Sequence, residues 1–148
     1  MAISNPTKVL FPTAGYTKLD LARYYLTVAE GALRAAGHRP NVLVRYPNGV
    51  GGEFFYQKRA PESRPDWIEV VALKFPSGRT AEEVVPRDAA ALVWLANLGC
   101  LELHPHPVRA DNRWATLAPK PCGAFRPVPT AVPPSGSSAS RGSTAVSR

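Results

Sequence analysis

Residues 88–105 read DAAALVWLANLGCLELHP, and this stretch indicates one helix followed directly by one strand. Asp88 is a suitable N-cap, the leucines that follow recur every three residues and face inward, and Gly99 ends the helix. CLELHP, residues 100–105, is the last ordered element that we expect. An apolar helix joined to a strand in this way predicts a helix layer packed on a sheet.

Upstream of this stretch, helical and strand-like patterns follow one another. Thr17 can cap a helix and Asp20 places a carboxylate in its first turn, so we expect a helix over 18–35 that Gly37 ends. The order of the predicted elements, α-β-β-β-β-α-β, indicates an α+β fold of mixed α/β layers. The strands are expected in a hairpin within 41–59, which turns at Pro47-Asn48-Gly49, and over 67–73 and 82–85.

Length and composition limit the class of protein. The chain has 148 residues, of which 45% are apolar and 20% charged, so it can bury the core of one ordinary domain. Two cysteines, at 100 and 122, are too few for a disulfide-stapled scaffold and form no CxxC pattern. No run of about 18 apolar residues is present, which excludes a membrane span. With no secretory pattern at the N-terminus, we expect a cytoplasmic protein without a membrane partner.

Positive charge is concentrated toward the C-terminus. Residues 1–111 carry 13 basic residues and all 11 acidic ones, whereas residues 112–148 carry five basic residues and no acidic one. The second segment is rich in Pro, Ser and Ala, which predicts a basic disordered tail after a folded part over 1–111. It is either a tail that binds nucleic acid or a segment without a selected function.

Motifs of known catalytic chemistry are missing. Residues 1–111 contain no D-x-D or D-x-E pair of the kind that holds two metal ions, and the chain has no P-loop, GxSxG or HExxH motif. His104 and His106 would project to the same face of an extended strand and could share a metal ion. No third ligand is evident, so the residues themselves predict no metal site.

Two lysines stand at the beginning of the first helix. Lys8 lies in a proline-bounded loop, and Lys18 lies in the first helical turn, where backbone N–H groups already favour an anion. The pair is either a phosphate pocket or two solvated surface lysines, and composition alone favours the second interpretation.

The run Phe54-Phe55-Tyr56 is an unusual aromatic feature. On a strand, Phe54 and Tyr56 face one side and Phe55 faces the other. Rings near solvent beside Arg45 and Lys58 suit base stacking together with neutralisation of a nucleic-acid backbone. The alternative is that all three rings pack inside the core as cross-strand neighbours.

Several blocks in the right order resemble a known family. NPTKVLFPTAGYTKLDLARYY, RPNVLVRYPNGVGGEFFYQK, DWIEV and DAAALVWLANLGCLELHP are similar to the start of the polymerase domain of bacterial DNA ligase D. That domain is a primase-polymerase of the archaeo-eukaryotic primase type, and it acts in non-homologous end joining. The resemblance covers residues 4–111, which is the N-terminal part of the family domain.

The resemblance implies a role for seven residues. In the family, two lysines recognise the 5′-phosphate of a broken DNA end, an aromatic pair stacks at that end, and a histidine lies by the incoming nucleotide. Aligning the FFxK block on its lysine leaves Phe54 outside the aromatic pair. The matching positions are Lys8 and Lys18 for the phosphate, Phe55 and Tyr56 for stacking, Lys58 and Arg45 as DNA-facing support, and His104 for the nucleotide.

The sequence departs from the family after ELHP. The family has a D-x-D block there and a third aspartate further on, which hold manganese or magnesium, and these ligands are absent from this chain. We therefore expect a chain truncated before the catalytic aspartates, or a frameshifted copy, that is inactive as a polymerase by itself. Its expected partners are DNA ends, a ligase and an end-bridging protein. The alternatives are a non-catalytic module that binds the 5′-phosphate of DNA ends and a pseudogene product with no function.

Overall fold

A computed structural model describes residues 2–111, so the predicted tail over 112–148 lies outside the described residues. Helices alternate with antiparallel strands, as the α+β prediction requires. The elements in chain order are β1 (Val9–Phe11), β2 (Tyr16–Thr17), α1 (Lys18–Thr27), α2 (Ala29–Ala36), β3 (Asn41–Arg45), β4 (Phe55–Gln57), β5 (Val70–Lys74), β6 (Thr80–Val84), α3 (Ala89–Asn97) and β7 (Cys100–Pro105).

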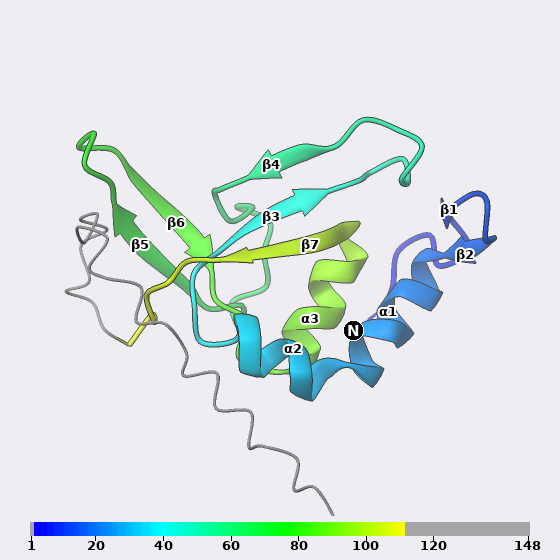
Figure 1. The fold of residues 1–148 in the computed structure, drawn as a ribbon, viewed down its shortest axis with the longest axis horizontal. Helices are drawn as coiled ribbons and strands as arrows, with labels where there is room; N and C mark the ends of the chain where they lie inside the picture. The colour runs from blue at the N-terminus through cyan, green and yellow to red at the C-terminus, as the bar shows by residue number, and fades with distance from the viewer. Residues whose placement is uncertain (1, 112–148) are drawn as a thin grey trace, which may run out of the picture. The chain divides into compact units, whose positions relative to one another are not determined.

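Strand β3 is the centre of the larger sheet. It pairs along one edge with β4 and along the other with β7, so the hairpin predicted within 41–59 is present. Strand β6 meets β3 only at Asn41–Val84 and carries β5 beside it. A separate two-stranded sheet, β1 with β2, lies next to α1 (Figure 1).

The three helices lie together on one side of the larger sheet (Figure 1). Their apolar side chains, among them Leu21, Leu92 and Leu95, form one buried cluster with Leu43 of β3. Leu43 and Leu103 are direct partners on β3 and β7, and both belong to this core or pack against it. Because side chains alternate along a strand, the neighbours of Leu103 on β7 point to the opposite, open face of the sheet.

The helix predicted over 18–35 is two helices. α1 ends at Thr27 and α2 begins at Ala29, with Val28 between them at φ −97° and ψ 8°. The hydroxyl of Thr27 donates to the carbonyl oxygen of Arg23 at 3.1 Å. Such a bond bends a helix slightly, and the β-branched Val28 has a lowered helix propensity, but helical backbone bonds continue from Val28 to Tyr24 at 3.0 Å and from Ala32 to Val28 at 2.9 Å. Within residues 2–111, no helix is both long and apolar enough to cross a bilayer.

The predicted strand boundaries differ by a few residues in two places. The strand predicted over 67–73 begins at Val70, because the N–H of Ile68 donates to the carbonyl oxygen of Pro65 at 3.0 Å and closes a turn. The strand predicted over 82–85 begins earlier, at Thr80. By contrast, the Asp88 cap and the strand over 100–105 are as predicted, and Gly99 adopts the left-handed φ of +70°.

Candidate functional site

Lys8 and Lys18 are joined through their backbones. The N–H of Lys18 donates to the carbonyl oxygen of Lys8 at 2.8 Å, directly beside the Val9–Thr17 pair of β1 and β2. Thr17 and Asp20 form the predicted capping box at the beginning of α1. The cap and the small sheet together hold both lysines at the same end of the helix.

The backbone donors of the first helical turn are already used. The N–H of Lys18 bonds to Lys8, that of Leu19 donates to Pro6 at 3.0 Å, and that of Asp20 donates to the hydroxyl of Thr17 at 3.3 Å. The expectation that these N–H groups favour an anion is therefore wrong in this detail, since each has a protein acceptor. The positive charge available here comes from side chains.

Both lysine ammoniums are held by neutral acceptors. Nζ of Lys18 donates to Oγ of Ser4 at 3.2 Å, and Nζ of Lys8 donates to Oδ1 of Asn48 at 3.3 Å. Ser4 is anchored in turn, because its N–H and hydroxyl both donate to Oδ1 of Asn97, at 2.9 and 3.0 Å. A hydroxyl or an amide oxygen orients an ammonium without neutralising it.

Lys18 is a buried residue whose cation pairs with no carboxylate of residues 2–111. The residue is only 8% exposed, and burial, followed by the charges of Lys8 and Arg45, lowers its pKa below the ordinary 10.5. Among residues 2–111, no carboxylate forms an ion pair with any of these three cations. A buried charge of this kind is costly unless an opposite charge joins it, so the site favours an anion.

Arg45 extends the positive charge to the sheet. Its Nε donates to the carbonyl oxygen of Leu98 at 2.9 Å, and its Nη1 donates to Oε1 of Gln57 at 2.7 Å. The guanidinium carbon lies 5.3 Å from the centre of the Phe55 ring, within the range of a cation–π contact. Burial lowers the pKa of Arg45, but its ordinary value is high enough for the charge to persist.

All three rings of the run at 54–56 are solvent-exposed. The exposed fractions are 51% for Phe54, 44% for Phe55 and 56% for Tyr56. The alternative that all three rings pack inside the core is therefore excluded. An exposed row of rings beside basic side chains is able to stack on bases.

The rings divide between the two sides of strand β4. Phe55 lies over Arg45, the cation whose charge contributes to the lowered pKa of Lys18. Tyr56 lies in a row on the open face, with Phe54 at 5.8 Å and His104 at 6.0 Å between ring centres. Tyr46 extends this row, stacked on Phe54 at 5.3 Å. The predicted pair Phe55 and Tyr56 is thus split, and strand alternation already indicated that Phe54 accompanies Tyr56.

His104 and His106 contact different carboxylates. Nε2 of His104 lies 3.1 Å from Oε2 of Glu102, and Nε2 of His106 lies 2.8 Å from Oε2 of the buried Glu83. In the part of the chain that the structure describes, no three His, Cys, Asp or Glu side chains gather as a metal site would require. Sequence reasoning missed Glu102, although its position two residues before His104 on the same strand face was a usable signal.

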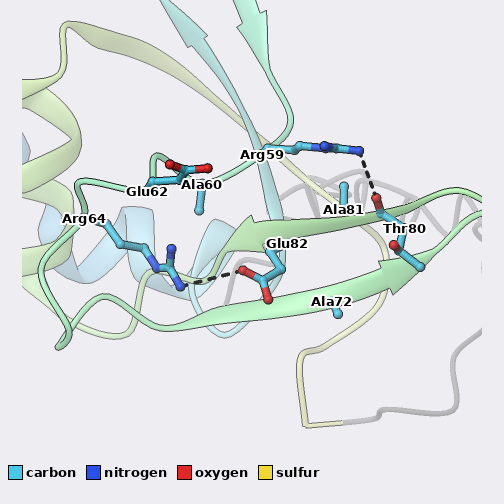
Figure 2. Close-up of a pocket in the computed structure, with 8 residues that line it drawn as sticks. All are labelled: Arg59, Ala60, Glu62, Arg64, Ala72, Thr80, Ala81 and Glu82. Carbon is cyan, nitrogen blue, oxygen red and sulfur yellow. Dashed lines mark hydrogen bonds and ion pairs between the residues drawn. The ribbon is translucent and has the colours of Figure 1, made fainter.

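Lys58 belongs to another part of the surface. It lines a pocket of about 320 Å³ with Arg59 and Arg79, next to the turn between β5 and β6. Figure 2 shows the neighbouring pocket, of about 420 Å³, where Arg64 lies 3.7 Å from Glu82 and Arg59 donates to the carbonyl oxygen of Thr80 at 3.4 Å. The two arginines and two glutamates in Figure 2 balance one another, unlike the cations around Lys18, which form no ion pair with a carboxylate of residues 2–111.

Three comparisons with known proteins point to the same protein family. Residues 17–122 match the family model described as LigD, primase-polymerase domain. The chain is 35% identical over 102 residues to the multifunctional non-homologous end joining protein LigD of Mycolicibacterium smegmatis, which covers 69% of this chain and 13% of that protein. It is 33% identical over 129 residues to the corresponding LigD protein of Mycobacterium bovis, covering 87% of this chain and 16% of that protein.

A solved structure shares the fold. The polymerase domain from Mycobacterium tuberculosis Ligase D in complex with DNA superimposes with a TM-score of 0.70 at 35% identity. The match covers 74% of this chain and 38% of that chain. This chain therefore spans less than half of the solved domain and less than a fifth of the length of the two LigD relatives. The α+β fold predicted from the sequence is confirmed.

Proposed function

The chain belongs to the LigD primase-polymerase family, and on this premise we propose that it binds the 5′-phosphorylated end of broken DNA as part of an end-joining repair polymerase. The observation that carries the proposal is the environment of Lys18. Lys18 is a buried residue, its ammonium has no carboxylate partner within residues 2–111, and Lys8 and Arg45 are neighbouring charges.

A terminal phosphate matches this environment in charge and in hydrogen bonding. A phosphate monoester carries close to two negative charges and three acceptor oxygens, so it can take bonds from both ammoniums at once. In the absence of a phosphate, Ser4 holds the ammonium of Lys18 and Asn48 holds that of Lys8. An internal DNA phosphate carries one charge, and it neutralises the cluster less completely. The proposal therefore predicts a preference for a phosphorylated end over DNA in general.

The aromatic residues and His104 complete the proposed interface. Phe55, next to Arg45, would stack on the base at the phosphorylated end, and Lys58 would follow the backbone further along. Tyr56 lies beside His104 on the open face, and we assign this side to the incoming nucleotide. The two rings would thus serve two different ligands.

Nucleotidyl transfer of this kind generally uses divalent metal ions. Residues 2–111 do not fit a metal site, because they bring together no cluster of three potential ligands. We expect the family to use manganese or magnesium for nucleotidyl transfer. No step proposed for this chain involves that ion. Binding of the DNA end needs none. We also propose that the protein acts in the cytoplasm, together with a ligase and an end-bridging protein.

Binding to matched DNA ends tests the proposal. A fluorescent duplex with a recessed 5′ end is titrated with the full 148-residue chain, with and without the 5′-phosphate, at fixed salt. The phosphorylated end should bind about tenfold more tightly, since charge-assisted hydrogen bonds are worth roughly 1.5–3 kcal/mol. Lys8→Ala together with Lys18→Ala should remove the difference between the two duplexes.

A second double variant controls for net charge. Arg23→Gln with Arg34→Gln removes the same two charges from exposed positions, where each Arg lies near a carboxylate of its own helix. This variant should keep the phosphate preference. If the wild-type chain binds both duplexes equally, only general attraction of a basic chain to DNA is left, and the proposal fails.

A further inference from the structure

Five side chains on the open face of the sheet contact one another in a closed series. Tyr46 stacks on Phe54, Phe54 contacts Tyr56, and Tyr56 contacts His104, with ring centres 5.3, 5.8 and 6.0 Å apart. Glu102 contacts both ends of this series. Its Oε2 lies 3.1 Å from Nε2 of His104, and its Oε1 accepts a hydrogen bond of 2.9 Å from the hydroxyl of Tyr46.

Strand pairing brings these residues together. Glu102 and Tyr56 are both opposite Val44, on β7 and β4 respectively, and His104 is opposite Val42. These three side chains therefore lie on one face of the sheet, away from the helices. Glu102 is the one member that is not a ring, and it is the one that joins the two ends of the aromatic row.

We propose that Glu102 is a positioning residue that fixes the ring of His104, so that Nε2–H points to the carboxylate and Nδ1, which also carries hydrogen in the imidazolium form, donates to a nucleotide phosphate. This inference rests on the proposed function, which places His104 beside the incoming nucleotide. Glu102 itself touches neither the nucleotide nor the DNA end in this assignment.

The chemistry of the carboxylate gives the direction of the bond. Hydrogen bonds from His104 and then from Tyr46 lower the pKa of Glu102 below its ordinary 4.5, so the group is ionised at neutral pH. An ionised carboxylate only accepts hydrogen bonds. Nε2 must therefore carry the hydrogen, and Nδ1 is the nitrogen left for a ligand. In the imidazolium form, Nδ1–H can donate to a phosphate oxygen.

Positioning matters here because His104 is close to the surface. Its side chain is 47% exposed, and an unsupported imidazole at such a site turns among several rotamers and between two tautomers. Glu102 holds one edge of the ring, and Tyr56 packs against it with the ring planes 77° apart. A ligand then meets a ring that is already oriented, which lowers the entropy cost of binding.

Nuclear magnetic resonance of the imidazole nitrogens tests the orientation directly. In the full chain at a pH where the ring is neutral, His104 should be present almost entirely as the Nε2–H tautomer. Glu102→Ala should produce a mixture of both tautomers. Glu102→Gln keeps an acceptor oxygen and should restore the Nε2–H form in part. A wild-type spectrum with hydrogen mainly on Nδ1 overturns the proposal.

A double-mutant cycle tests the effect on the ligand, with ATP and Mg²⁺ as the probe in calorimetric titrations. Glu102→Ala should weaken ATP binding about fivefold, as expected for the loss of one hydrogen bond of roughly 1 kcal/mol. In a His104→Ala background the same substitution should have no further effect. An equal loss in both backgrounds would mean that Glu102 acts on the fold and not through His104.

The DNA-end assay separates this inference from the proposed function. Glu102→Ala should keep the preference for a 5′-phosphorylated end, because Lys8 and Lys18 are intact in that variant. Loss of that preference would again indicate a structural role and contradict the inference. If His104→Ala binds ATP as the wild type does, the nucleotide role of His104 is wrong, and both this inference and that part of the proposed function fail.

Discussion

The N–H of Lys18 donates to the carbonyl oxygen of Lys8 at 2.8 Å, so one backbone bond joins the two lysines of the proposed phosphate site. The bond continues the pairing of β1 and β2 by one residue. Lys18 is also the first residue of α1, which makes its position dependent on the capping box as well. The relative position of the two lysine backbones is thus set by a turn and a helix cap.

Lys18→Met should stabilise the free chain while it removes phosphate recognition. Lys18 is buried, no carboxylate of residues 2–111 compensates its ammonium, and its lowered pKa means that the charged form is disfavoured in the folded state. At neutral pH this cost is fully present, since the group is protonated both folded and unfolded. Methionine keeps an apolar stem without the charge. We expect the melting temperature at pH 7 to rise by a few degrees.

Thermal unfolding and the DNA-end assay measure both effects in the same variant. Lys8→Met is the matched control, because Lys8 is less buried, and it should lose phosphate preference with little change in melting temperature. As the pH is raised toward the lowered pKa of Lys18, the stability advantage of Lys18→Met over the wild type should shrink. An advantage that stays constant up to alkaline pH would mean that the charge of Lys18 costs nothing.

Phe55 and Tyr56 should differ in the ligand that they serve. Phe55 lies over Arg45, whereas Tyr56 lies against His104 on the other side of the strand. Phe55→Leu should weaken binding of the phosphorylated DNA end about fivefold or more, since one stacked base is worth roughly 1–3 kcal/mol. Tyr56→Leu should mainly weaken binding of ATP. Fluorescence anisotropy measures the affinity for DNA, and calorimetry measures the affinity for ATP. If both variants lost affinity for both ligands equally, the division into two faces would be contradicted.

Glu83→Gln should stabilise the chain by an amount that grows with pH. Burial raises the pKa of Glu83 above its ordinary 4.5, against the opposing charges of His106 and Lys58. A group with a raised pKa contributes stability below about 4.5, and that contribution is lost as the pH rises through its folded value. Glutamine is neutral throughout. Melting temperatures of the variant and the wild type should therefore diverge from pH 4.5 upward.

Glu82→Gln is the control for this prediction. Glu82 neighbours Glu83 on β6 but is exposed and lies 3.7 Å from Arg64, so its loss should change stability by little at any pH. If Glu83→Gln shows no pH-dependent gain, Glu83 is well compensated by His106, whose Nε2 lies 2.8 Å away.

The 148-residue chain should not extend a primer by itself. Residues 2–111 bring together no metal-ligand cluster, and residues 112–148 contain no Asp or Glu. A primer-extension assay with manganese or magnesium and all four nucleotides measures this, with a LigD polymerase domain as the positive control. Robust incorporation that stops when the metal is chelated would show that other residues of the chain hold the ion.

Local signals in the sequence were sufficient for most of the secondary structure. The cap at Thr17 and Asp20, the cap at Asp88 and the turn after Arg45 each depend on residues within a few positions of one another. Such interactions form in the same way wherever the segment lies in the fold. The interruption at Val28 was missed because the helical pattern of the sequence is continuous across it.

Sequence by itself determined which residues to consider and on which strand face each would lie, because alternation and capping are properties of short segments. Only the tertiary structure decided their electrostatic setting. Ser4 accepts directly from Lys18 and is held by Asn97, which lies 93 residues beyond Ser4 in the chain, and Tyr46 meets Glu102 of β7. Packing between distant segments buries Lys18 and leaves it with no carboxylate partner within residues 2–111. No short-range pattern in the sequence encodes this environment.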